Sequence, residues 1–148
     1  MNLGLKRLET FGMLSDDEKF INKHYLDYTK NSFSKYFGEN LFLKKEEFSN
    51  AAAGMGFYRL TYEKNSRYQI VFEYERLRFT IRIKWGRATS NFFSQHKGLQ
   101  NNLAEENIDE AISALKNDIS NGDLEFFQIS KKGEIKQVEE QLIDDTKF

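Results

Sequence analysis

The chain has 148 residues, a formal net charge of −1 and an aromatic content of 15%. A chain of this length can bury a hydrophobic core without disulfides or metals to stabilise it. It contains no Cys and no apolar run of the length that a signal peptide or a membrane span needs, so we expect a cytoplasmic protein that neither is secreted nor enters a membrane.

The first expected element is a helix that begins at Ser15, whose hydroxyl can cap the backbone while Glu18 reaches back to it. Apolar residues then recur at steps of three to five residues as far as Phe37, and Gly38 suits the position after the helix. The expected core-facing residues are Ile21, Tyr25, Tyr28, Phe33 and Tyr36.

The segment after this helix has a weaker pattern. Residues 41–43 resemble a short buried strand, and residues 46–53 resemble a short helical turn.

Residues 57–86 carry the clearest pattern, an alternation of apolar and polar residues that predicts a β-meander. The arms 68–75 and 78–85 each have an apolar face and a polar face. A turn between them that places Phe72 opposite Ile81 brings all the apolar partners to one side.

The alternation does not by itself fix the turn or loop that joins each pair of arms in the meander. A turn at Arg76 and Leu77 gives the pairing above, but it lacks the Asn-Gly chemistry of a type I′ turn, so a four-residue turn with the same pairing stays open. The upstream arm, residues 58–62, is expected to place Tyr58 opposite Phe72 and to join the next arm through a loop with a bulge.

The second half of the chain predicts a helix and another hairpin. Residues 88–99 form a polar loop or an irregular fourth strand, and a helix follows that Asn107 caps and Gly122 ends. Strands at 124–130 and 135–138 then form a hairpin around a turn that contains Gly.

The fold class predicted by these elements is α+β, as a single domain over residues 1–148. An antiparallel sheet is built on the central meander plus the C-terminal hairpin, and the N-terminal helix and the helix of the C-terminal half pack on one face. Whether the two hairpins share one sheet is left open. An exposed edge at 124–130 can pair between chains, so both a monomer and a homodimer are compatible with the sequence.

Charge is unevenly distributed. Residues 57–87 contain eight Lys or Arg against three Glu, whereas residues 101–148 contain five Lys against twelve Asp or Glu. The polar face of the meander is basic and favours nucleic acid or a phosphate-bearing ligand as one alternative. The residues of this alternative are Arg59, Arg78, Arg82 and Lys84. It is the less favoured reading because the aromatic residues lie on the opposite face, where the core needs them.

The two histidines, His24 and His96, lack the short spacing of a metal site, and we expect no metal and no cofactor. His96 is the residue best placed to titrate near neutral pH, so an enzyme or a small-ligand carrier with a pocket between helix and sheet is a further alternative.

The favoured function is a non-enzymatic protein-binding module. One version is an immunity-type protein that inhibits a bacterial toxin, in which the acidic surface 105–110 or the hairpin 123–140 blocks a basic cleft and electrostatic attraction speeds association. The expected partner-binding residues are aromatic, acidic or flank the meander, namely Trp85, Arg87, Phe92, Phe93, His96, Glu105, Glu106, Asp109 and Glu110.

Overall fold

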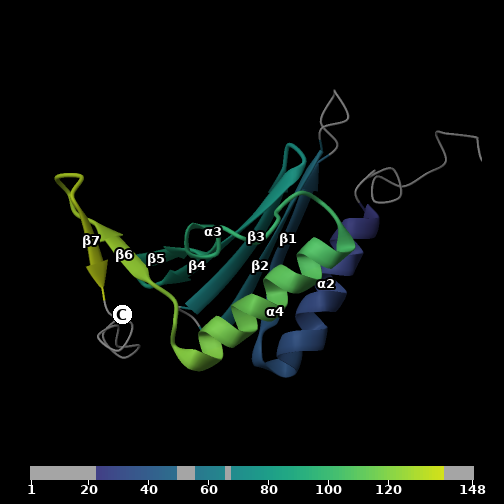
Figure 1. Ribbon diagram of the computed structural model, residues 1–148, viewed down its shortest axis with the longest axis horizontal. Helices are drawn as coiled ribbons and strands as arrows, with labels where there is room; N and C mark the ends of the chain where they lie inside the picture. Colours follow the sequence, from purple (N-terminus) through teal and green to yellow (C-terminus); the bar gives the residue numbers. More distant parts are fainter. Residues whose placement is uncertain (1–22, 50–55, 66–67, 139–148) are drawn as a thin grey trace, which may run out of the picture.

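The computed structural model describes residues 23–49, 56–65 and 68–138 (Figure 1). The helical elements in these ranges are α2 (Lys23–Phe37), the 3-10 turn η2 (Gly38–Asn40), α3 (Phe92–Gln95) and α4 (Glu105–Asn121). The strands are β1 (Phe42–Ser49), β2 (Phe57–Asn65), β3 (Tyr68–Glu75), β4 (Arg78–Trp85), β5 (Ala88–Asn91), β6 (Phe126–Ile129) and β7 (Ile135–Val138).

Within the described ranges, the seven strands form one antiparallel sheet in the order of the sequence. The helices α2 and α4 lie side by side over one face of this sheet (Figure 1). The chain is therefore α+β as predicted, and the meander and the C-terminal hairpin belong to the same sheet. None of the helices in the described part has the length and apolar composition needed to cross a bilayer.

The pairing of β3 with β4 confirms the predicted register, with Phe72 opposite Ile81. The turn consists of Arg76 and Leu77, whose φ angles are 55° and 73°. Positive φ at both central residues is the geometry of a two-residue type I′ turn. The chain therefore adopts the tight turn and not the four-residue alternative.

The predicted register of β2 against β3 is wrong by two residues. Tyr58 lies opposite Tyr74 instead of Phe72. A shift of two residues leaves every side chain on its original face, so the inward-facing set is the predicted one. The expected bulge is present, between Glu63 and Asn65.

The strand β1 corrects the prediction for residues 41–53. Residues 46–49 are strand and not helix, because they pair with the edge of β2, where Glu46 lies opposite Leu60. Pairing satisfies backbone groups of β2 that would otherwise have no strand beside them, and this outweighs the helix preference of a charged run. In the expected buried strand 41–43, Leu41 is buried but the side chain of Phe42 is 58% exposed. Residues 50–53 lie outside the described ranges.

The helix α2 ends where Gly38 adopts a φ of +56°, as the sequence predicted. The predicted start at Ser15 and the predicted core residue Ile21 lie outside the described residues. Phe33 and Phe37, at the end of the predicted stripe, are buried, together with Leu26, which the prediction omitted. The tyrosines at 25, 28 and 36 pack at the margin of the core.

The helix α4 begins two residues before the predicted cap. Ala104 precedes it without a side-chain cap, and Asn107 lies within the helix, where its amide donates to the carbonyl oxygen of Asn102 at 3.0 Å. Gly122 ends the helix as predicted, with a φ of +70°.

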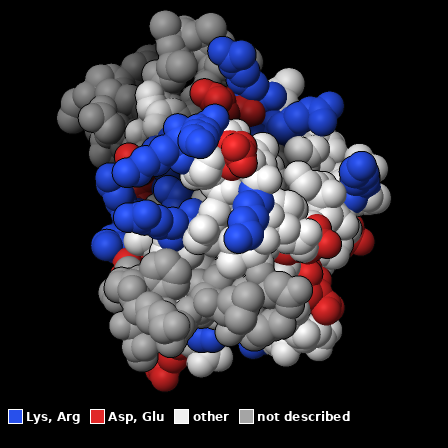
Figure 2. Space-filling model, turned by 90° about the vertical axis from the view of Figure 1, so that its left-hand side faces the viewer, with Lys and Arg blue, Asp and Glu red and all other residues white. Residues whose placement is uncertain are grey.

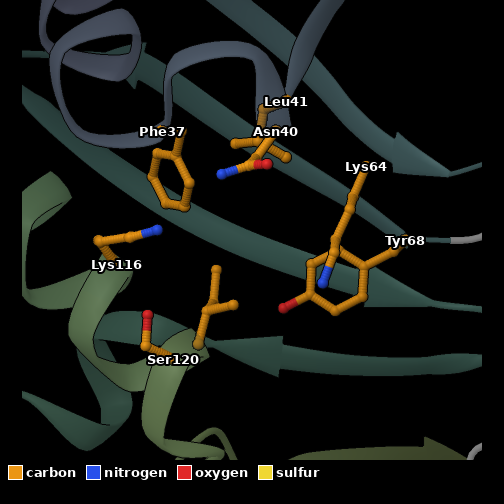
Figure 3. A pocket seen from close by; sticks show the side chains of 8 residues that line it. Phe37, Asn40, Leu41, Lys64, Tyr68, Lys116 and Ser120 are labelled. Atoms are coloured by element: carbon orange, nitrogen blue, oxygen red, sulfur yellow. The ribbon is translucent and has the colours of Figure 1, made fainter.

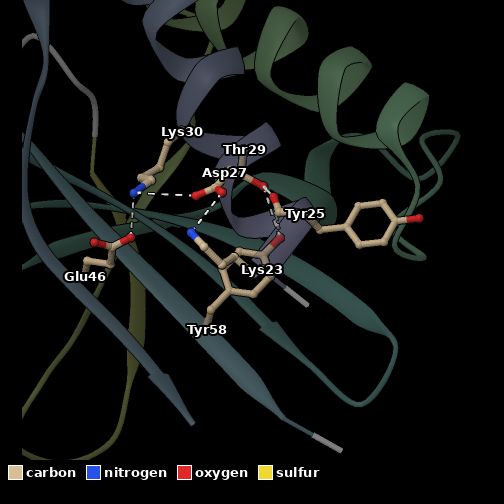
Figure 4. Close-up of polar contacts among 7 residues, drawn as sticks. All are labelled: Lys23, Tyr25, Asp27, Thr29, Lys30, Glu46 and Tyr58. Atoms are coloured by element: carbon tan, nitrogen blue, oxygen red, sulfur yellow. Dashed lines mark hydrogen bonds and ion pairs between the residues drawn. The ribbon is translucent and has the colours of Figure 1, made fainter. Parts of the chain in front are cut away.

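The core between the sheet and the helices is built from aromatic rings. Phe72 is fully buried, and its ring centroid lies 4.9 Å from that of Phe79 and 5.9 Å from that of Tyr58. The buried hydroxyl of Tyr58 lies 3.0 Å from that of Thr29, which itself donates to the carbonyl oxygen of Tyr25 (Figure 4). This contact fixes α2 on β2 without leaving a buried hydroxyl unsatisfied.

An ion pair joins α2 to the first strand. The Lys30 ammonium lies 2.8 Å from a Glu46 carboxylate oxygen, and Figure 4 shows the same ammonium beside Asp27. Since Glu46 lies on the helix-covered face of β1, this pair places the edge of the sheet against the helix.

Candidate functional site

The face of the sheet that points away from α2 and α4 carries the residues of the nucleic-acid alternative, but they differ in availability. Arg59 is held by two carboxylates, since its Nε donates to Glu73 at 2.7 Å and its Nη1 to Glu47 at 3.3 Å. The hydrogen bond to Glu73 is the main reason why the pKa of Arg59 is raised. Its charge is therefore largely neutralised within the sheet.

The other three residues of this set are exposed on β4. The Arg78 guanidinium donates to the side chain of Asn101 at 3.4 Å. The side chains of Arg82 and Lys84 form no hydrogen bond or ion pair with another described residue. In Figure 2, many Lys and Arg side chains lie at the upper left of the face shown, and several Asp and Glu side chains lie at its lower right, although the two signs are mixed elsewhere on this face.

The aromatic residues of the predicted partner site mostly fill the edge of the core. Phe92 is fully buried and is not available to a partner, which corrects that prediction, and Phe93 is partly buried beside it. Trp85 packs between Tyr68 and Phe126, with ring centroids 5.2 and 5.8 Å away. Their burial has a simple cause, because β5 and α3 fold back along β4 and close the end of the core.

Arg87 remains exposed in the turn between β4 and β5. Gly86 precedes it with a φ of +60°, at the first position of a two-residue turn, where a positive φ suits Gly.

The acidic residues at the start of α4 divide into two kinds. Glu105 lies 2.5 Å from the His24 ring nitrogen Nε2, so it links α4 to α2. Glu106 and Glu110 are exposed and form no ion pair with other residues in the described part.

Asp109 joins the two helices. It accepts hydrogen bonds from Ser32 Oγ at 2.9 Å and from the Tyr36 hydroxyl at 2.9 Å, and the Lys35 ammonium lies 3.4 Å away. Burial tends to raise the pKa of Asp109, but these hydrogen bonds and the charge of Lys35 outweigh it and hold the pKa below its ordinary value. Asp109 thus acts within the chain and is not presented to a partner.

His96 has a partner that the sequence did not reveal. Its Nε2 lies 2.5 Å from Asp118 Oδ2, and its ring lies 4.5 Å from that of Phe92. The only signal in the sequence was the place of Asp118, which follows Leu115 by three residues, at a position of the helix where the spacing predicts a residue that faces the core. A carboxylate in this place fixes the orientation of the imidazole, as in a His–Asp pair that moves protons.

A hollow of about 490 Å³ opens beside this pair, lined by Gln95, His96, Asp118, Asp123 and Glu125. None of these lining residues carries a hydroxyl or thiol nucleophile. Elsewhere in the described residues, no group of three or more His, Asp or Glu side chains is arranged to hold a metal ion. The hollow supplies a positioned imidazole and the carboxylates of Asp118, Asp123 and Glu125.

The β6–β7 hairpin lies in the segment 123–140 that the sequence offered as a toxin-blocking surface, but the apolar pair that it exposes was not predicted. Ile129 and Ile135 lie opposite each other in the hairpin, and each is 71% exposed. The turn is held by Ser130 Oγ, which accepts the backbone N–H groups of Lys132 at 3.3 Å and Glu134 at 3.1 Å. The side chains are therefore displayed on an ordered hairpin.

The position of this hairpin corrects the predicted sheet edge. The strand β6 is paired on both sides, by β5 and by β7, so the edge assigned to residues 124–130 is not open. In the described part of the chain the outermost strands are β1 and β7. Figure 1 shows β7 at the end of the sheet away from the helices.

Comparisons of the chain with protein-family models, with curated proteins and with solved structures find no match. The functional argument therefore depends on the surfaces described above. Of these, the β6–β7 hairpin combines exposed apolar side chains with an outermost strand.

Proposed function

We propose that this chain is a cytoplasmic protein-binding module whose partner docks on the β6–β7 hairpin. The observation that carries the proposal is the exposed pair of Ile129 and Ile135. Single exposed apolar residues are common on protein surfaces, but two isoleucines side by side, one on β6 and one on the outermost strand β7, form a surface that favours association. A partner that covers the pair removes apolar surface from water, which favours binding.

The partner is an extended segment of another protein that pairs with β7. An outermost strand offers backbone N–H and C=O groups to such a segment, and a side chain of the segment on the face of Ile135 packs against the exposed pair. Lys131, Lys132 and Lys136 outnumber Glu134 on the hairpin, so acidic residues in the partner would complement it.

A different version of the protein-binding proposal is an immunity-type inhibitor of a toxin that docks on the acidic start of α4 instead of the hairpin. The exposed Glu106 and Glu110 support it, because an acidic surface complements a basic toxin cleft and speeds association. Co-purification with a small toxin encoded beside this protein supports this version. If no such gene lies nearby, the broader protein-binding proposal is retained and the toxin is abandoned.

The hairpin proposal is tested by capture of partners from the source cell with the tagged full chain. The test variant is the double substitution Ile129→Asp and Ile135→Asp, and the matched control is Leu77→Asp, since Leu77 is 66% exposed in a different turn. The expected result is one protein bound in stoichiometric amount by the wild type and the control and lost with the double variant. If the double variant retains that protein, the hairpin is not the docking surface.

A second candidate function is the binding of single-stranded nucleic acid through Arg78, Arg82 and Lys84. The observation that favours it is that all three exposed cations project from the same face of β4. Three phosphate contacts on a single strand predict that the logarithm of the affinity falls with the logarithm of the salt concentration with a slope of roughly −2. An oligonucleotide affinity that is insensitive to salt excludes this candidate.

A further inference from the structure

A second cavity, of about 280 Å³, lies between the end of α2, the C-terminal half of α4 and the adjacent ends of β2 and β3 (Figure 3). Its walls combine two rings, two ammonium groups and two neutral polar side chains. These are Phe37, Tyr68, Lys64, Lys116, Asn40 and Ser120. The sequence predicted a pocket between helix and sheet but could not say which residues would line it.

The charge of this cavity is entirely positive. Lys64 and Lys116 come from different elements, and no Asp or Glu lines the cavity. Each ammonium lies over a ring, Lys116 at 5.4 Å from the Phe37 centroid and Lys64 at 5.7 Å from the Tyr68 centroid. In the described part of the chain, neither lysine has a carboxylate within ion-pair distance, in contrast to Lys23, Lys30 and Lys35.

A cation over a ring at an exposed site is worth only about 0.5–1 kcal/mol, so these contacts orient the lysines but do not neutralise them. Two converging positive charges without a counter-ion favour an anion between them. The rings and the apolar wall favour an apolar body attached to that anion, and the Asn40 amide and Ser120 hydroxyl add hydrogen-bonding capacity.

We propose that this cavity binds a small organic anion, a carboxylate or a phosphate monoester carried on an apolar ring or a short chain. The cavity lies near the lower end of the range of roughly 300–1,000 Å³ that small-molecule sites occupy, which limits the ligand to a small one. The site is separate from the β6–β7 docking surface and does not depend on it.

The chain contains its own reporter for this site. Trp85 is the single tryptophan, and its ring centroid lies 5.2 Å from that of Tyr68, which lines the cavity. A ligand that contacts Tyr68 changes the surroundings of Trp85, so tryptophan fluorescence follows occupancy without a label.

The experiment is a fluorescence titration of the full chain with phenyl phosphate and, separately, with phenylacetate. Benzyl alcohol serves as the neutral analogue and inorganic phosphate as the anion without an apolar body. We expect saturable binding of at least one organic anion, and weaker binding of both controls. The relative affinities of phenyl phosphate and phenylacetate identify the preferred anion.

Substitutions then locate the site. Lys64→Gln and Lys116→Gln should each weaken binding of the organic anion by about tenfold, the loss expected for one charge-assisted hydrogen bond. Lys97→Gln, which removes an exposed lysine that does not line the cavity, should leave the affinity within about twofold, since surface charge alone contributes little. Backbone amide shifts in NMR spectra should be confined to residues around the cavity.

Three outcomes overturn the proposal. The first is the absence of a saturable fluorescence or amide-shift change with either organic anion up to millimolar concentrations. The second is equal weakening by Lys97→Gln and by the two cavity substitutions. The third is binding of benzyl alcohol as tight as that of the organic anions, which would make the site an apolar one.

Discussion

Replacement of Asp109 by Asn tests whether this residue joins the two helices, as the structure indicates. The substitution keeps the size of the side chain and removes its charge. The carboxylate accepts two hydrogen bonds at 2.9 Å, from Ser32 and Tyr36, and its side chain is only 26% exposed. Asp109→Asn should therefore destabilise the fold measurably.

The magnitude follows from these contacts. A hydrogen bond to a charged group contributes about 1.5–3 kcal/mol, and Asn retains part of both bonds, so we expect a loss of about 2 kcal/mol at neutral pH. For a chain near 150 residues, this corresponds to a decrease in Tm of roughly 4–8 °C. The matched control is Glu110→Gln, which removes the same charge from an exposed position of the same helix and should change stability by less than about 0.5 kcal/mol.

The effect should depend on pH in a defined direction. Because the folded pKa of Asp109 lies below its ordinary value, the stabilisation by its charge is complete above that ordinary value, roughly 3.9, and is lost as the pH falls through the folded pKa. Urea denaturation at neutral pH and near pH 3 measures this. The difference in the free energy of unfolding between wild type and Asp109→Asn should become smaller as the pH is lowered. A difference that is constant or grows at low pH, or a control that loses as much stability as the variant, would refute the assignment.

Two further substitutions test the core and the meander turn, both by urea denaturation. Phe72→Ala should lower the free energy of unfolding by about 3–5 kcal/mol, because Phe72 is fully buried among rings. Leu77→Ala on the surface should lower it by less than about 1 kcal/mol. Similar values for the two variants would mean that the rings do not form the core. The double substitution Arg76→Asn and Leu77→Gly should raise stability by about 1 kcal/mol, since both positions have positive φ and Asn-Gly suits a type I′ turn; a loss of stability would contradict this turn geometry.

The sequence predicted the centre of the sheet better than its margins, for physical reasons. Between β3 and β4 both arms alternate except at Val71, so only one tight turn aligns the two apolar faces, and the predicted register was confirmed. Between β2 and β3 a slip of two residues preserves both faces, and alternation alone does not distinguish the two registers. At 46–49 the charged run favoured a helix, but pairing with β2 decided its conformation.

The candidate sites were harder to predict because each depends on residues far apart in the sequence. His96 was recognised as a titratable group, but its partner Asp118 lies 22 residues away on another element. Lys64 and Lys116 line one cavity only because the fold brings the end of β2 and the C-terminal half of α4 to the same place. An isoleucine at position 129 fits a strand pattern whether its side chain is buried or exposed to solvent. Only the arrangement of the sheet shows that the Ile129 side chain is exposed.

The central claim, that a partner docks on the β6–β7 hairpin, is tested most directly by hydrogen exchange of the full chain alone and in complex with its captured partner. The predicted result is that the amides of β7, residues 135–138, exchange more slowly in the complex, because a partner strand pairs with them. Slower exchange confined to α4 or to β4, with the β7 amides unchanged, would contradict the account and assign the partner to the acidic helix or to the basic face of the sheet.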